Sequence, residues 1–321
     1  MASRATCLRR ARYCHNASGS RLSSTIPIII NAGAGNHLAS SRARTIRELF
    51  QAAGIPVDVR LAKTGPELDA MIRAAVDEHP KTLVAAGGDG TISTAASALV
   101  GTDIALGVLP FGTLNHFAKD LGIPLALEES VQNLIDNNVI AVDVGEVNGR
   151  IFINNSSLGM YPDMVRDRER QQARLGRGKL RSLVWASIAV LRRFPFLTVR
   201  IDVESEKRVL VTPIVFIGNN EYQMEGFDIG ARASLEGGTL CIYIVKKQGR
   251  AALVRLSLAA LIGRLKQARD FEAHTATEVV IETRHAHILV SADGEVVRMT
   301  TPLRYRVRPR SLRVIVPRLV G

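Results

Sequence analysis

Two glycine-containing turns and one acidic turn near the C-terminus carry the residue types best suited to chemistry on a phosphate group. The first turn, Gly87-Gly88-Asp89-Gly90-Thr91, lies between an apolar run and a segment with helical spacing. Glycines allow backbone N–H groups to approach a phosphate closely, and the amino end of the following helix adds its positive dipole. An ordinary tight turn with Thr91 as the helix N-cap is the simpler interpretation, but the strand before and the helix after favour phosphate binding. The Gly-Lys-Ser/Thr ending of a Walker loop is missing.

The second turn, Pro110 to Ala118, follows the next apolar run and contains Gly112. Because both turns follow strands of one predicted parallel sheet, they should emerge at the same edge and face one ligand. Thr113 and Asn115 provide short hydrogen-bonding side chains for phosphate or ribose oxygens. In the first turn, Asp89 offers a carboxylate to a magnesium-bound water, and Thr91 offers a hydroxyl group to a phosphate or to the helix end. Alone, the second segment would be only a Pro/Gly turn with a helix cap.

The acidic turn is Asp293-Gly294-Glu295, directly after the strand-like run His287 to Ser291. A carboxylate on a turn can accept the proton of an incoming hydroxyl group while other groups stabilise a transferring phosphoryl group. Asp-Gly is also a common hairpin signal, and without further context the hairpin is the better interpretation.

The elements that must position these turns alternate between apolar runs and amphipathic segments. The runs Ile26–Ile30, Val57–Leu61, Thr82–Ala86 and Ile104–Leu109 are typical of buried strands, and apolar residues recur at helical spacing between them. This order predicts a parallel sheet covered by helices, whose carboxyl-end loops bind nucleotides. We therefore predict an α/β nucleotide-binding domain over residues 26–142, completed by residues 304–321.

From about residue 143 onward the pattern becomes β-rich. Strand-like runs such as Leu197–Val203, Val209–Ile217 and Thr239–Val245 are separated by two long basic helical segments, Met164–Phe194 and Arg250–Phe271. We predict a second, mostly antiparallel β-rich domain over residues 143–303. The expected fold is thus an α/β N-terminal domain with a parallel sheet plus a mostly antiparallel β-rich C-terminal domain.

The composition limits the partners and the setting of the protein. Hydrophobic residues make up 46% of the 321 residues, so two domains can each bury a core. The formal charge of +12 favours an anionic partner: nucleic acid, acidic lipid or a phosphate-bearing substrate. The three cysteines are far apart or in the N-terminal tail, which favours a reducing compartment. No apolar run approaches the roughly 20 residues that span a bilayer, so membrane contact should be peripheral.

Residues 1–25 differ from the rest of the chain. They contain several arginines and serines, and the first acidic residue of the chain is Glu48. This composition fits a transit peptide, but a disordered tail or an over-long start is the favoured interpretation.

The two turns together resemble a known family. Gly-Gly-Asp-Gly-Thr followed by Pro-x-Gly-Thr-x-Asn-x-Phe-Ala is similar to the catalytic domain of diacylglycerol kinases and related bacterial lipid kinases, to which sphingosine and ceramide kinases are also similar. The resemblance runs from about Ile26 to Pro317. It implies ATP bound in a cleft between two domains, Mg²⁺, a lipid substrate, and transfer of the γ-phosphoryl group to a lipid hydroxyl, most directly that of diacylglycerol.

The resemblance also implies roles for single residues. It gives Asp293 and Glu295 catalytic roles, as general base and its support, without deciding which one takes the proton. It gives Asp143 the role of a further acidic residue in the magnesium–water network, and a loop carboxylate at the domain junction is the alternative. Asn31 to Gly35 matches the family's first nucleotide loop, and Thr64 is included in the nucleotide site. The expected nucleotide-binding residues are Asn31, Gly33, Gly35, Thr64, Gly87, Gly88, Asp89, Gly90, Thr91, Gly112, Thr113 and Asn115.

Two positions depart from the family pattern. His116 stands where the family commonly has an aspartate, and an imidazole cannot replace a carboxylate in a magnesium network. Gly237 stands where many relatives have an aspartate that binds a structural magnesium. Magnesium requires oxygen ligands, so this second metal site is expected to be absent unless Glu236 substitutes.

A basic segment suggests contact with anionic lipid. Seven basic residues crowd into it, and each contributes on the order of 1 kcal/mol near an anionic membrane. A solvated helix face with salt pairs is the alternative. Arg304, Arg306 and Arg308 alternate along a strand and either extend the patch or protect a sheet edge. We expect a cytoplasmic, peripherally membrane-associated protein, with a homodimer and mitochondrial targeting by the tail left open. The seven residues are Arg166, Arg168, Arg170, Arg174, Arg177, Lys179 and Arg181.

Other functions remain to be separated by experiment. NAD kinase also uses a Gly-Gly-Asp-Gly loop after a strand, but the second turn and the Asp-Gly-Glu turn argue against it. A nucleic-acid-binding protein should interleave aromatic with basic residues, whereas aromatics are only 5% of the chain, so we expect no nucleic-acid partner. A lipid- or nucleotide-binding protein without activity is a further alternative, and His116 is the reason to consider it. Within lipid kinases, a sphingoid base, ceramide or phosphatidylglycerol is a competing substrate.

Overall fold

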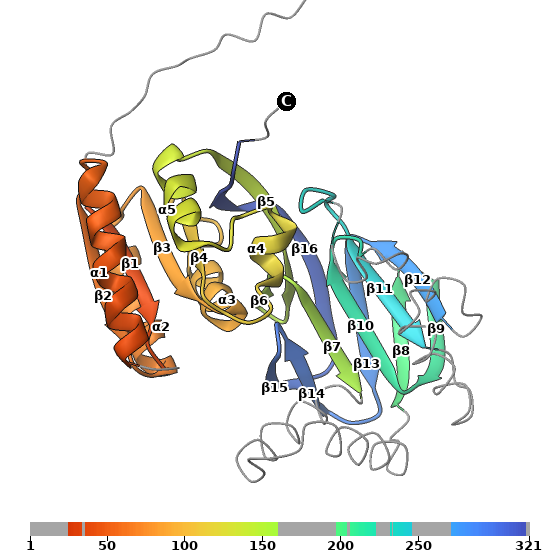
Figure 1. Cartoon of the computed structure of the whole chain (residues 1–321). Helices are drawn as coiled ribbons and strands as arrows, with labels where there is room; N and C mark the ends of the chain where they lie inside the picture. Colours follow the sequence, from red (N-terminus) through yellow and green to blue (C-terminus); the bar gives the residue numbers. More distant parts are fainter. Residues whose placement is uncertain are drawn as a thin grey trace, which may run out of the picture.

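The structure, a computed structural model, describes residues 25–33, 36–159, 197–203, 206–222, 232, 234–245 and 271–318. It has an α/β part built by the first half of the chain and a β-sandwich part built by the second half (Figure 1). This is the fold class that the sequence predicts. The predicted basic segment 166–181, the tail 1–24 and Gly35 lie outside the described residues.

Four parallel strands form the centre of the α/β part. They are β1 (Ile26–Asn31), β2 (Val57–Ala62), β3 (Thr82–Gly87) and β4 (Ala105–Pro110), in the order β2-β1-β3-β4. Every residue of β3 and β4 is buried, which explains their unbroken apolar character. Because the strands are parallel, their carboxyl ends all meet at one edge.

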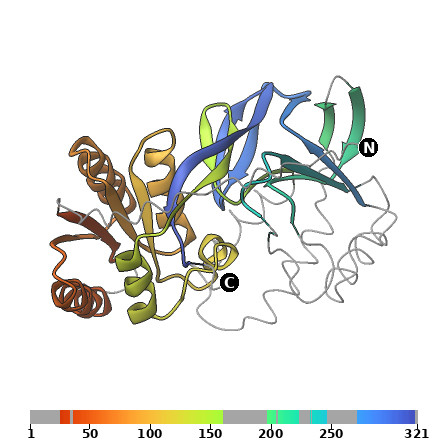
Figure 2. The same ribbon diagram turned by 90° about the horizontal axis from the view of Figure 1, so that it is seen from above.

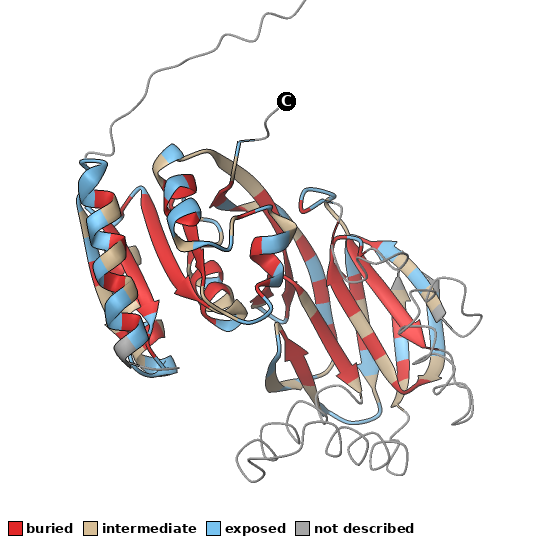
Figure 3. Cartoon of the chain, in the orientation of Figure 1, coloured by how far each residue is buried: buried red, intermediate tan, exposed pale blue. Residues whose placement is uncertain are grey.

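Helices cover both faces of these strands. The apolar sides of α2 (Gly65–Asp77) and α3 (Asp89–Leu99) pack in one core cluster, and those of α1 (Asn36–Ala52) and α5 (Leu127–Asp136) pack in another on the opposite face. The short helix α4 (His116–Asp120) directly follows the second glycine turn. In Figure 3 the buried residues lie along the strands and the inner helix faces.

The sandwich part consists of two facing sheets around a third core cluster. One sheet is antiparallel throughout, in the order β12-β11-β10-β7-β14-β15. Its strands are β7 (Asn155–Gly159), β10 (Ile214–Asn219), β11 (Leu240–Val245), β12 (Phe271–Ala276), β14 (His287–Ala292) and β15 (Glu295–Thr300). The facing strands are β6 (Arg150–Phe152), β8 (Leu197–Val203), β9 (Glu206–Thr212) and β13 (Glu278–Thr283), with parts of β5 and β16.

Two long strands run through both parts and connect them. Strand β16 (Leu303–Ile315) pairs with β13 at its start and with β4 through Val314 near its end, and β5 (Val139–Val147) pairs with β16 along most of its length. The parallel strands and one face of the sandwich are therefore a single ten-stranded sheet. Seen from above in Figure 2, β5 and β16 lie between the two parts. This shared sheet fixes the position of the acidic turn relative to the glycine turns.

Candidate active site

The carboxyl ends of the parallel strands bring most of the predicted nucleotide-binding residues to one edge. Asn31 ends β1, Gly87 ends β3, and Gly112 follows the last residue of β4. Thr64 lies beyond β2 as the N-cap of α2, where its hydroxyl group accepts a hydrogen bond from the Glu67 N–H at 3.3 Å. These turns come from separate stretches of chain, and the parallel pairing places them side by side.

The two glycine turns touch each other. The Phe111 N–H donates to the Gly87 carbonyl at 2.8 Å, and a methyl group on Gly112 would lie 2.6 Å from the Cα atom of Gly88. Only a residue without a Cβ atom fits at that approach, since a real Cβ does not come so close to backbone. The predicted pairing of the turns around one point is therefore present in the fold.

Polar contacts with the Asn31 side chain hold the first turn in place. The Asn31 side chain donates to Thr91 Oγ1 at 2.9 Å and accepts from the Gly33 N–H at 3.0 Å. Helix α3 begins at Asp89 with Gly88 as its N-cap, so Thr91 is not the cap. Thr91 is buried, and a Cβ on Gly87 would overlap its side chain. The N–H groups of the first turn of α3, beginning with Asp89 and Gly90, are thus left at the edge for an anion.

The side chain of Asn115 forms its hydrogen bonds within the second turn. Asn115 Oδ1 accepts from the Gly112 N–H and its Nδ2 donates to the Gly112 carbonyl, both at 2.9 Å, which closes the turn. These contacts give Asn115 a structural role, whereas Thr113 and His116 are exposed at the site edge. The Arg42 guanidinium lies 4.2 Å from the centre of the Phe111 ring and so places a positive charge against this turn. No motif pointed to Arg42, because only the fold brings α1 beside the turn.

The acidic turn, which belongs to the sandwich part, contacts helix α3, the helix that follows the first glycine turn. Asp293 and Gly294 both have positive φ, 48° and 85°, and connect β14 to β15, so the Asp-Gly hairpin signal was correct. The Asp293 carboxylate accepts a hydrogen bond of 2.6 Å from Ser93 Oγ on α3, one helical turn beyond Asp89. Ser93 was not predicted, since a serine at this place carries no sequence signal.

Three further donors hold the same carboxylate. The N–H groups of Ile153, Asn154 and Asn155 donate to Asp293 at 2.8, 2.8 and 3.2 Å. Both oxygens therefore accept two hydrogen bonds each. Burial raises the pKa of Asp293 above its ordinary value, and these donors oppose that rise. A carboxylate with all four acceptor positions in use is well placed to fix the turn and has no position left for the hydroxyl group of a substrate.

Glu295 has the opposite environment. Its side chain is 71% exposed, and its Oε2 atom accepts a 2.6 Å hydrogen bond from Arg150, whose side chain is 35% exposed. Among the described residues, Glu295 Oε1 has no hydrogen-bond partner. Glu295 starts β15 two residues after Asp293, the residue that contacts α3, and its Oε1 atom is available to a substrate.

The two predicted metal-binding residues, Asp89 and Asp143, have different surroundings. Asp89 is half-buried at the start of α3, on the site edge. Asp143 is buried, and its carboxylate accepts from Gly238 N–H at 2.6 Å, Arg310 N–H at 2.9 Å and Asn220 Nδ2 at 3.2 Å. These contacts tie β5 to the sandwich and give no support for a magnesium role of Asp143. Within the described residues no cluster of three acidic, histidine or cysteine side chains fits a metal ion, and Glu236 beside Gly237 is exposed.

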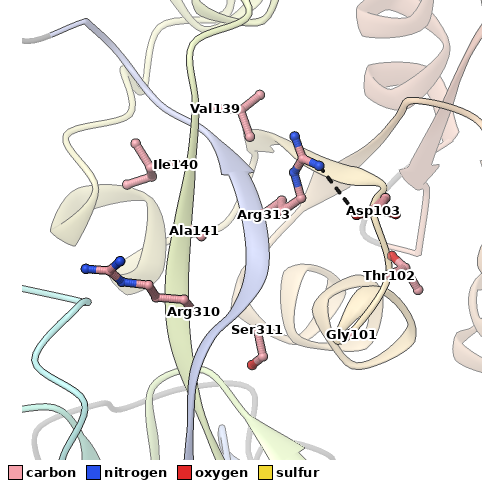
Figure 4. A pocket seen from close by; sticks show the side chains of 9 residues that line it. All are labelled: Gly101, Thr102, Asp103, Val139, Ile140, Ala141, Arg310, Ser311 and Arg313. Atoms are coloured by element: carbon pink, nitrogen blue, oxygen red, sulfur yellow. Dashed lines mark ion pairs between the residues drawn. The ribbon is translucent and has the colours of Figure 1, made fainter. Parts of the chain in front are cut away.

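Two surface cavities lie away from this site. One of about 470 Å³ is lined by the turn after α3 and by β5 and β16, including Arg310 and Arg313 (Figure 4). The other, of about 620 Å³, includes Thr82 and Ala105, the first residues of β3 and β4. Both therefore lie at the edge of the sheet opposite to the glycine turns.

Of the basic residues that motivated the membrane hypothesis, the structure describes Arg304, Arg306 and Arg308. Glu146 forms ion pairs of 2.8 Å with Arg306 and 3.3 Å with Arg308, so two of the three alternating arginines are paired. No helix among the described residues has the length and apolar character of a membrane span.

The structure is thus an α/β part with two touching glycine turns, joined through a shared sheet to a β-sandwich that supplies an acidic turn. Residues 25–147 match the diacylglycerol kinase catalytic domain, and residues 159–316 match the YegS C-terminal NAD kinase beta sandwich-like domain. The chain belongs to the diacylglycerol kinase catalytic-domain family, which confirms the resemblance predicted from the two turns.

Individual relatives agree with this assignment. The chain is 25% identical over 245 residues to a diacylglycerol kinase of Bacillus subtilis, covering 74% of this chain and 78% of that one. It is 29% identical over 163 residues to a protein of Cronobacter sakazakii named probable lipid kinase YegS-like, covering 49% and 53%. A crystal structure of a diacylglycerol kinase from Bacillus anthracis has the same fold, with a TM-score of 0.66, 19% identity and coverage of 92% and 98%. An uncharacterised protein of Synechocystis is 29% identical over 248 residues, which are 75% of this chain and 56% of that protein, so the chain spans little more than half of some relatives.

Proposed function

We propose that this protein is an ATP-dependent lipid kinase that transfers the γ-phosphoryl group of ATP to a lipid hydroxyl, with diacylglycerol as the substrate and phosphatidic acid as the product. The observation that carries the proposal is the 2.6 Å contact between Asp293 and Ser93. It places the acidic turn of the sandwich beside the helix that begins at the first glycine turn. This contact supports the proposal, because it brings the acidic turn toward the turns that we propose to bind the phosphates of ATP.

The transfer assigns a separate task to each group. The lipid hydroxyl oxygen forms a bond to the γ-phosphorus, the bond from the γ-phosphorus to the β–γ bridging oxygen breaks, and ADP leaves. Glu295 takes the hydroxyl proton, because its Oε1 atom is available while both oxygens of Asp293 are in use. Backbone N–H groups of the first turn and the Arg42 cation stabilise the negative charge on the transferring group. Asp293 holds the Glu295 turn in place.

In this proposal, magnesium is the ion that normally accompanies ATP. Asp89 is the residue that would contact it, and the ion would neutralise phosphate charge. Asp143 is left out, since its carboxylate is already used. We also propose peripheral association with an anionic membrane, motivated by the basic segment 166–181.

The direct test is transfer of labelled phosphate from ATP to diacylglycerol, phosphatidylglycerol, sphingosine, ceramide and NAD, presented in mixed vesicles where they are lipids. Label on diacylglycerol is the expected result. Label on another lipid alone keeps the kinase and corrects the substrate. Label on NAD but on no lipid rejects the lipid kinase in favour of the NAD kinase alternative.

Gly112→Ala should weaken nucleotide binding. The added methyl group would lie 2.6 Å from the backbone of Gly88, so the two turns must move apart. We expect the KM for ATP to rise about tenfold, with a smaller change in kcat, since the loss falls on binding shared by ground and transition states.

Gly65→Ala is the matched control for this variant. A methyl group there meets no atom within 4 Å, and Gly65 has no positive φ. An unchanged ATP KM in Gly112→Ala, measured with folded protein, contradicts a nucleotide site between the turns.

A further inference from the structure

Arg232 is a buried charge at the junction of the two parts. Its side chain is 0% exposed, that of its partner Asp120 is 6% exposed, and Nε lies 2.7 Å from Asp120 Oδ2. The Arg232 backbone N–H also donates to Asp120 Oδ1 at 3.3 Å. A buried ion pair gives little net stability compared with an apolar pair of similar size. Stability alone therefore does not explain this residue.

The remaining donors of the guanidinium reach one short segment and one strand end. Nη1 donates to the Ile153 carbonyl at 2.6 Å and to the Asn219 carbonyl at 3.2 Å, and Nη2 donates to Asn154 Oδ1 at 2.8 Å. Ile153 and Asn154 connect β6 to β7. A planar guanidinium can hold several acceptors in one fixed geometry, which an ammonium group cannot.

This connecting segment is the one that binds Asp293. Its N–H groups point to the Asp293 carboxylate, whereas the Ile153 carbonyl and the Asn154 side chain point to Arg232. The Asn154 carbonyl accepts a further hydrogen bond of 3.0 Å from Tyr222. Residues 153 and 154 are thus bound by Arg232 through the Ile153 carbonyl and the Asn154 side chain, and by Asp293 through their N–H groups. If Arg232 shifts these residues, the N–H groups that donate to Asp293 shift with them.

The other end of the connection is the second glycine turn. Asp120 is the last residue of α4, the helix that directly follows this turn. A continuous chain of contacts therefore connects the second glycine turn with Asp293. It passes through α4, Asp120 and Arg232 to the N–H groups that donate to the Asp293 carboxylate.

We propose that Arg232 is a positioning residue for phosphoryl transfer, which fixes the acidic turn relative to the second glycine turn. This inference rests on the lipid-kinase function proposed above. Arg232 acts through Asp120 and the Ile153–Asn155 segment and does not touch the reacting atoms.

Two variants separate positioning from stability. The double variant Asp120→Leu/Arg232→Met removes the ion pair without leaving an unpaired buried charge. The Ile153, Asn219 and Asn154 acceptors lose their Arg232 donors, however, so the variant should fold but unfold below the wild-type temperature. It should bind ATP with full stoichiometry and unchanged affinity, yet its kcat for lipid phosphorylation should fall about a hundredfold, because a displacement of about 1 Å suffices for such a loss. Arg232→Lys keeps the charge, and its kcat should lie between these values. Arg60→Lys, in a surface pair with Asp58 and Glu78, is the control and should match the wild type.

Wild-type kcat in the folded double variant overturns the proposal, because the pair would then serve the fold alone. If the double variant does not fold, Arg232→Lys decides: wild-type kcat in the folded protein overturns positioning, and a reduced kcat with unchanged ATP affinity supports it. A wild-type protein that phosphorylates no lipid overturns the proposed function itself, and the wild-type reactions reveal that case separately.

Discussion

Replacing Glu295 by glutamine is expected to lower kcat for lipid phosphorylation by about a thousandfold, within the range for loss of a general base. Glutamine has nearly the same size but cannot accept the hydroxyl proton. The side chain is 71% exposed, so the change removes no packing, and the unfolding temperature should stay near that of the wild type. The KM for ATP should also stay close to its wild-type value, because the nucleotide turns are untouched. Steady-state kinetics and thermal unfolding of the same preparation check both expectations.

Glu282→Gln is the matched control, since Glu282 is also an exposed glutamate paired with an arginine, Arg200, at 3.2 Å. It lies on β13, away from the glycine turns, and should leave kcat unchanged. A Glu295→Gln enzyme with at least one-tenth of wild-type kcat contradicts Glu295 as the proton acceptor and returns that task to Asp293.

Sequence patterns predicted the α/β half of the fold well, because each of its strands and turns is marked by residues that are adjacent in the chain. Each buried strand is a short apolar run, each glycine turn directly follows a strand, and parallel pairing then brings the turns to one edge. The contact between Gly88 and Gly112 follows from this rule alone. The Asp-Gly hairpin at residue 293 is local in the same sense.

The network that joins the two parts was not predictable from these patterns. Ser93 and Asp293 are 200 residues apart in the chain, and Asp120 and Arg232 are 112 apart. Neither serine nor arginine has a spacing that marks such a partner. Only the shared strands β5 and β16 determine which loop of the sandwich meets α3.

The type of a residue likewise predicts which hydrogen bonds its side chain can form. It does not predict which group in the folded protein forms them. Asn115 was predicted to bind nucleotide oxygens, and its side chain also closes its own turn. Asp143 was predicted near magnesium, and its carboxylate accepts three donors at the junction. In both cases a buried polar side chain needs a protein partner, and the nearest backbone groups supply it.

Asp293→Asn is expected to lower kcat by a similar factor, about a thousandfold, through a different cause. Asparagine tolerates positive φ, as Asn148 shows in the β5–β6 hairpin, so the β14–β15 turn should form. Its amide group, however, presents N–H donors where Ser93 and three backbone N–H groups also donate. The turn should shift, Glu295 should move with it, and ATP binding should remain measurable by calorimetry.

The stability of this variant relative to wild type should depend on pH in a definite direction. Burial raises the folded-state pKa of Asp293 above the ordinary value of 3.8, so the folded protein binds this proton more tightly than the unfolded chain does. The corresponding stabilisation is complete below the ordinary pKa and is lost as pH rises through the raised one. Asparagine does not titrate, so the unfolding free energy of wild type minus that of Asp293→Asn should be larger at about pH 4 than at about pH 7. A difference that instead grows toward neutral pH would mean that the four donors outweigh burial, and that Asp293 is held as a permanent anion.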